Sequence, residues 1–125
     1  MIGLLLVGAG GFLGSVFRYV VSGWVHYLLD NPWFPYGTLV VNVTGCAAIG
    51  FLAGLAETRS LFTSDVRLFL FIGVLGGYTT FSSFALETFS LARNMQILAA
   101  FTNIGGQLIL GLIGVWFGNL LARLM

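Results

Sequence analysis

The sequence predicts an all-α integral membrane protein with four transmembrane helices, the third of them broken near its middle. Of the 125 residues, 58% are hydrophobic and only 7% are charged, whereas a soluble domain carries about 25% charged residues. Four long apolar segments are visible, and a spanning helix needs about 20 residues. Four spans use most of the chain, so we expect residues 1–125 to form a single domain.

The first span is expected at residues 2–21. Its glycines, among them Gly10 and Gly14, suit close contact with another helix. Arg18 is its charged residue and has two interpretations. The side chain either extends to the lipid headgroups or attracts anions in a vestibule, because ionisable groups within spans are usually functional.

The second span is expected at residues 36–56 and carries Asn42 several residues inside the apolar segment. An amide left unpaired in hydrocarbon is costly. Asn42 therefore either bonds to a neighbouring helix, a common way of joining membrane helices, or donates its amide protons to an anion. The residues alone leave both roles open.

The third span is expected at residues 66–91, with a break in the region of Gly76–Thr80. Glycine and threonine are poor helix formers, and here they occupy the centre of an apolar segment. Hydrocarbon cannot satisfy freed backbone groups, so such a break must be buried in protein or line a polar path. Broken helices of this kind are typical of transporters and channels, which aim backbone dipoles at ions.

Two faces of the helix after the break carry the candidate site. Phe81 and Phe84 share one face because they are three residues apart, and Thr80, Ser83 and Glu87 share the adjacent face. Aromatic rings have a positive edge, so rings presented edge-on can stabilise a small anion without holding it tightly. Conduction needs that balance between favourable binding and easy release.

The fourth span is expected at residues 96–121 and has two amides, Asn103 and Gln107, at i and i+4. They share one face of the helix, where they either bond to another helix or form a polar track. No nucleophile with a base, no acid–base pair and no metal-ligand cluster is visible in the sequence, so we expect no enzymatic activity.

The few charges give little guidance about orientation. Arg59, Arg67 and Arg123 belong to the side of the termini, and Arg18 and Arg93 belong to the other side. The positive-inside rule needs a stronger bias, so insertion in both orientations is permitted. Two-fold pairing is the commonest symmetry, which makes an antiparallel homodimer the natural assembly. Five arginines against four acids also leave no basic surface for nucleic acid.

Three motifs resemble those of the Fluc (CrcB) fluoride channels, and they cover the chain in order. They are GGFLGSVFRY at residues 10–19, PYGTLVVNVTG at residues 35–45 and GGYTTFSSF at residues 76–84. The resemblance implies passive export of fluoride from the cytoplasm, which reduces fluoride toxicity. It also implies a dual-topology antiparallel homodimer in lipid, in the bacterial inner membrane or the archaeal cell membrane.

The same resemblance assigns roles to residues. It implies that Phe81 and Phe84 are the pore phenylalanines and that Asn42 is the pore amide. Thr80, Ser83 and Gln107 are expected to add polar groups to the fluoride path, with Arg18 in its vestibule.

The resemblance further implies a structural sodium ion at the dimer interface, held by the backbone carbonyls of Gly76 and Thr79 from both subunits. Many members carry hydroxyl residues along the fourth span, whereas the matching face here reads Asn103, Gln107 and Gly111. Glycine has no side chain to donate, so only part of that polar track is expected in this chain.

A small proton-coupled multidrug exporter is the alternative function. Exporters of that class also have four short spans, and they need a carboxylate embedded in the membrane. Glu87 is the only candidate within a span.

Overall fold

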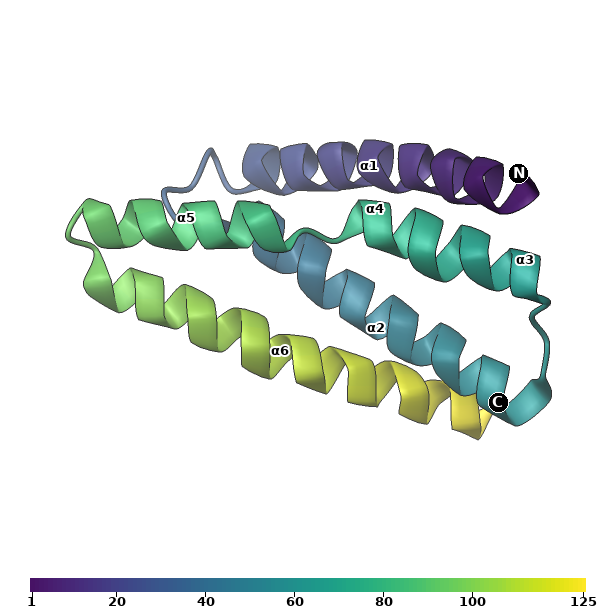
Figure 1. Cartoon of the computed structure of the whole chain (residues 1–125). Helices are drawn as coiled ribbons and strands as arrows, with labels where there is room; N and C mark the ends of the chain where they lie inside the picture. The colour runs from purple at the N-terminus through teal and green to yellow at the C-terminus, as the bar shows by residue number, and fades with distance from the viewer.

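The computed structural model describes residues 1–125 as a bundle of four long helical segments without strands (Figure 1). Three segments are continuous: α1 (Ile2–Leu28), α2 (Tyr36–Arg59) and α6 (Ile97–Leu124). The third segment consists of α3 (Ser64–Arg67), the π-helical η1 (Leu68–Leu75), α4 (Gly76–Tyr78) and α5 (Phe81–Arg93). All four segments are long and apolar enough to cross a membrane. The predicted all-α fold with four spanning segments is confirmed, and the chain is a multi-pass membrane protein.

The helices are longer than the spans expected from hydropathy. The first runs on to Leu28 and the second to Arg59, where the backbone turns into the left-handed region. Asp30 and Asn31 have φ of 55° and 53°, and Ser60 has φ of 49°. Such residues commonly end helices. Hydropathy follows the thickness of the hydrocarbon, whereas the helix continues until the backbone conformation changes.

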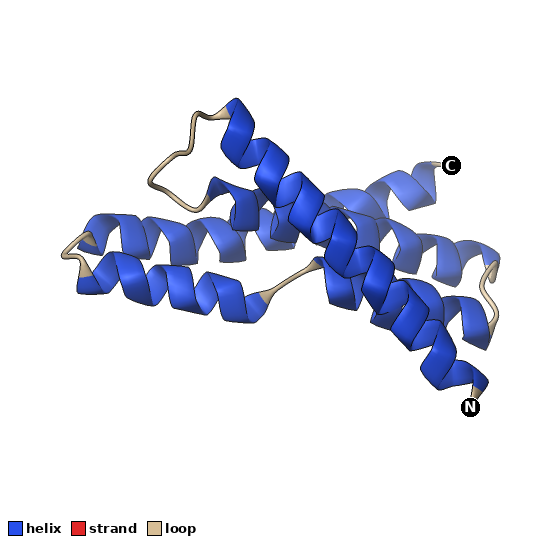
Figure 2. Cartoon of the chain, turned by 90° about the horizontal axis from the view of Figure 1, so that it is seen from above, coloured by secondary structure: helices blue, strands red, loops and turns tan.

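The segments pack mainly in two pairs, α1 against η1 and α4, and α2 against α6. Seen from above, α1 crosses the rest of the bundle obliquely (Figure 2). Glycines make both contacts close: a Cβ on Gly10 would lie 2.9 Å from the Gly73 Cα, and one on Gly118 would lie 2.8 Å from the Phe51 nitrogen. Small residues let membrane helices approach backbone to backbone, which confirms the expected use of Gly10.

The break in the third segment is shorter than the sequence predicted. Gly76 to Tyr78 remain helical, and only Thr79 (φ −81°, ψ 158°) and Thr80 (φ −150°, ψ 116°) are extended. The glycine pair does not end the helix, because Gly77 serves a helix contact instead. A Cβ there would lie 2.6 Å from the carbonyl oxygen of Gly11.

Thr80 ends the break by starting the next helix. Its side-chain oxygen accepts a hydrogen bond from the Ser83 backbone N–H at 3.2 Å, which satisfies one of the free N–H groups of the first turn. The π-helical η1 before the break was not predicted. Such turns are rare and are frequently found at functional sites.

The close contact of α1 with the third segment predicts different effects for two glycines of α1. In Gly14→Ala the new methyl group would meet the Tyr78 nitrogen at 2.8 Å, whereas nothing lies within 4 Å of a Cβ on Gly8. We expect Gly14→Ala to destabilise the protein by about 1–3 kcal/mol, the usual cost of overpacking. Gly8→Ala should leave stability unchanged or slightly higher, because alanine is the better helix former.

Thermal unfolding of both purified variants in detergent, beside the unaltered protein, measures this difference. Equal losses in the two variants would contradict the packing described here.

Candidate functional site

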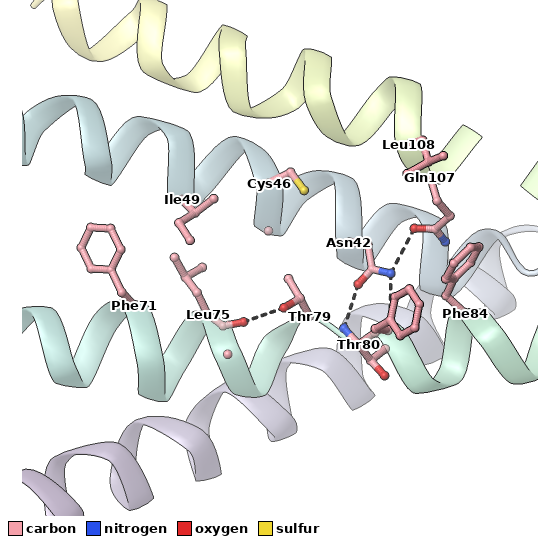
Figure 3. Close-up of a pocket in the computed structure, with 13 residues that line it drawn as sticks. Asn42, Cys46, Ile49, Phe71, Leu75, Thr79, Thr80, Phe84, Gln107 and Leu108 are labelled. Carbon is pink, nitrogen blue, oxygen red and sulfur yellow. Dashed lines mark hydrogen bonds between the residues drawn. The ribbon is translucent and has the colours of Figure 1, made fainter. Parts of the chain in front are cut away.

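The side chain of Asn42, on α2, holds the break of the third segment together (Figure 3). Its Oδ1 accepts the Thr80 backbone N–H at 2.8 Å, and its Nδ2 donates to the Thr80 carbonyl at 3.0 Å. One amide thus satisfies both backbone groups of an extended residue. In hydrocarbon no water is available for those groups, so this pairing makes an extended residue tolerable at membrane depth.

Gln107 connects α6 to the same point. Its Oε1 accepts the second proton of the Asn42 amide at 3.0 Å, so Asn42 directs both of its protons to acceptors within the chain. The Gln107 Nε2 is buried and has no hydrogen-bond partner. Of the two amides, Asn42 therefore bonds to its neighbours, and Gln107 provides the free donor.

The two phenylalanines flank these amides. The Phe81 and Phe84 ring centroids are 5.5 Å apart with an interplanar angle of 62°, an edge-to-face arrangement. Phe84 is half-buried beside Gln107 (Figure 3), whereas Phe81 is 78% exposed. Both line one groove of about 390 Å³ along the break, together with Asn42, Gly76, Thr79, Thr80 and Gln107.

The other predicted residues line a second, polar cavity of about 460 Å³ between α1, α2 and α5. Arg18, Ser83 and Glu87 lie there, and Thr80 is the only residue that lines both this cavity and the groove. The predicted site is therefore divided in two parts that meet at Thr80. The shared face of Thr80, Ser83 and Glu87 is confirmed.

Arg18 lies beside the break and is half-buried. Its Nη1 donates to the Thr79 carbonyl at a long 3.5 Å. Arg18 thus lies in a polar cavity of the bundle, and its attraction of anions there stays a prediction.

Ser83 and Glu87 bring a hydroxyl and a carboxyl group to the polar cavity. The Ser83 oxygen accepts from the Thr80 hydroxyl at 3.0 Å. The Glu87 Oε1 accepts from the Thr38 hydroxyl at 2.6 Å, and its Oε2 is buried without a partner. Thr38 was missed in the sequence because a lone threonine near a helix start has no distinctive pattern.

The carbonyl groups at the end of α4 are the candidate cation ligands. Gly76 is exposed and its carbonyl accepts no hydrogen bond, whereas the Leu75 carbonyl accepts both the N–H and the hydroxyl of Thr79 at 3.0 Å. A helix end leaves its last carbonyls free. No group of three or more His, Cys, Asp or Glu side chains could hold a metal.

The polar residues of α1 were also missed, apart from Arg18. Ser15, Ser22 and His26 line the same polar cavity as Arg18. Their spacing of three, four and four residues along the helix is a stripe on one face, and that signal was available in the sequence.

Comparisons with known proteins agree over almost the whole chain. Residues 5–119 match the family described as CrcB-like protein, Camphor Resistance (CrcB). A relative from Rhizobium meliloti (strain 1021), named fluoride-specific ion channel FluC, is 45% identical over 122 residues, covering 98% of this chain and 97% of the relative. One of the same name from Opitutus terrae is 48% identical over 122 residues, covering 94% and 90%.

A relative with a lower identity has a similar name. A relative from Methanosarcina acetivorans, named fluoride-specific ion channel FluC 1, is 40% identical over 119 residues, covering 95% of this chain and 89% of the relative. Both the family match and these identities span all four helical segments, and the chain therefore belongs to the CrcB-like family.

Proposed function

We propose that the chain is a fluoride channel of the cell membrane that lets fluoride leave the cytoplasm passively, and that it is not an enzyme. The observation that carries the proposal is the free amide donor of Gln107 in one groove with two phenylalanine rings, at the break of an apolar spanning segment. The names of the relatives agree with it. Hydrogen fluoride enters cells as a neutral molecule and ionises inside. A passive path therefore lowers the cytoplasmic concentration of the trapped fluoride anion.

The groups along the break would replace the hydration shell of fluoride in two steps. On the polar side of Thr80, the Arg18 guanidinium would offer positive charge, and the Ser83 hydroxyl would donate its proton. On the groove side, the Gln107 amide donates, and the positive ring edges of Phe81 and Phe84 complete the shell. Asn42 lines the groove and orients Gln107, because its own protons are already used.

Two antiparallel copies of the chain would form the complete channel. Phe81 and Gly76 are exposed on the open side of the groove in a single chain, so a second copy is needed to enclose a path for ions. The near balance of arginines at the two ends allows both orientations in the membrane. This dual-topology homodimer would cover the exposed Gly76 beside the break, whose backbone carbonyl lipid would leave without a partner.

A structural sodium ion would join the two copies at the break. The residues present fit such an ion: the Gly76 carbonyl has no donor, and the only donor to the Thr79 carbonyl is Arg18 at 3.5 Å. Free carbonyls at a helix end carry partial negative charge, and hard oxygen ligands suit a hard cation. These two carbonyls from each subunit would hold the sodium ion and fix the break of one copy against the other.

No observation favours the alternative of a proton-coupled multidrug exporter. Glu87 is the carboxylate that such an exporter would need, and one of its oxygens is already bonded to Thr38.

The role of the ring edges predicts the effect of Phe81→Ile, which keeps the residue apolar but removes the positive edge. We expect fluoride efflux from liposomes to fall by about tenfold or more, which corresponds to the loss of roughly 1.4 kcal/mol of stabilisation. Phe89→Ile is the matched control, because Phe89 is 62% exposed on the same helix and does not line the groove. Efflux at the original rate in Phe81→Ile would refute the role of the ring.

Because Asn42 pairs with the backbone and Gln107 has the free donor, their alanine variants should differ in melting temperature and in fluoride efflux. Asn42→Ala leaves the Thr80 N–H and carbonyl unpaired, at a cost of about 1–3 kcal/mol for each group, so it should lower the melting temperature markedly. Gln107→Ala should lower it less but still reduce fluoride efflux. Thermal unfolding and efflux measured on the same preparations distinguish these roles, and unchanged efflux in Gln107→Ala would exclude it as an anion donor.

A further inference from the structure

Three cavities of the chain adjoin one another in order from one end of the bundle to the break. The end cavity, of about 370 Å³, is lined by residues of the α1–α2 loop and the α5–α6 turn, and both connections lie at the same end of the bundle (Figure 1). The end cavity shares only His26 and Glu87 with the polar cavity, and the polar cavity shares only Thr80 with the groove. His26 and Glu87 therefore lie at the boundary between the end cavity and the polar cavity, which we call the mouth of the polar cavity.

His26 is held in a fixed orientation at this mouth. Its Nδ1 lies 2.7 Å from the Ser22 carbonyl, which can only accept, so Nδ1 carries the proton and Nε2 is the ring nitrogen left free. The ring also packs over the start of α2, where a Cβ on Gly37 would lie 2.6 Å from the His26 Cε1. A neutral ring offers a lone pair at Nε2, whereas a protonated ring offers a donor and a positive charge.

We propose that His26 is an anion-binding residue at the mouth of the fluoride path, and that its protonated ring passes fluoride on to Arg18. The inference rests on the proposed function and names a residue of the path beyond the break. Ser22 lies between the two along the same face of α1, and all three line the polar cavity. They are a continuous stripe of donors that begins at the end of the bundle.

Few other ionisable groups face His26, and protonation of His26 or Glu87 makes the polar cavity more positive. Arg18 and Tyr19 face the polar cavity from α1, and Glu87 faces it from α5. The α2 residues Thr38 and Val41 and the loop residues of the end cavity cannot ionise. Protonation of His26 therefore adds one positive charge opposite the Glu87 carboxyl, and protonation of Glu87 would change the charge in the same sense.

Fluoride efflux from liposomes as a function of pH tests the proposal. Acid favours the protonated ring, so efflux should rise as the pH is lowered from about 8 to about 5.5. We expect an increase of about tenfold, the lower end of what a charged cleft adds to the association rate of an ion. Protein-free liposomes at each pH correct for hydrogen fluoride that crosses the lipid.

Two substitutions separate charge from structure. His26→Gln should give low efflux that no longer changes over this range, and His26→Arg should give high efflux at every pH in it. Tyr27→Phe is the matched control, since Tyr27 lies next to His26 and lines neither cavity, and it should keep the original profile. If His26→Gln keeps that profile, the proposal is overturned while the channel function stands.

Direct binding provides a measurement that does not depend on flux. His26 is the only histidine, so its ring gives a single set of NMR signals in the purified protein. Fluoride, but not gluconate at the same ionic strength, should shift these signals at about pH 5.5 and much less at about pH 8, because only the protonated ring offers a second N–H donor. Identical spectra with both anions would overturn the proposal. Efflux absent at every pH would instead remove the channel function on which it rests.

Discussion

Asn42 pairs with both backbone groups of Thr80 and so stabilises the break in the third segment. A bilayer gives no water to a freed N–H or carbonyl, and one asparagine supplies both partners at 2.8 and 3.0 Å. The pairing lets the third segment stop and restart at membrane depth. It also orients Gln107, frees the carbonyls at the end of α4, and starts α5 with Phe81 and Phe84 beside the groove.

Close helix packing puts these groups at the same depth. Gly10 and Gly14 bring α1 against η1 and α4, so Arg18 lies beside the break and donates to Thr79. The glycines between α2 and α6 likewise bring Asn42 within 3.0 Å of Gln107. The glycines at these helix contacts therefore set the distances between the polar groups of the site.

Much of this was predictable from the sequence, because the bilayer restricts the possible folds. Four spans, a break in the third and the shared face of Thr80, Ser83 and Glu87 follow from hydropathy and helical spacing. The position of the break at Thr79–Thr80, the π-helical η1 and the use of both Asn42 protons within the chain do not. Those features depend on contacts between distant segments, which spacing along one helix cannot reveal.

A polar break flanked by aromatic side chains should conduct fluoride selectively and passively. The decisive experiment is efflux from liposomes containing the purified protein, followed with a fluoride electrode and with chloride in parallel. We expect rapid fluoride release without a proton gradient and without comparable chloride release. Equal release of both anions, or no release beside an active preparation of a known fluoride channel, would contradict it.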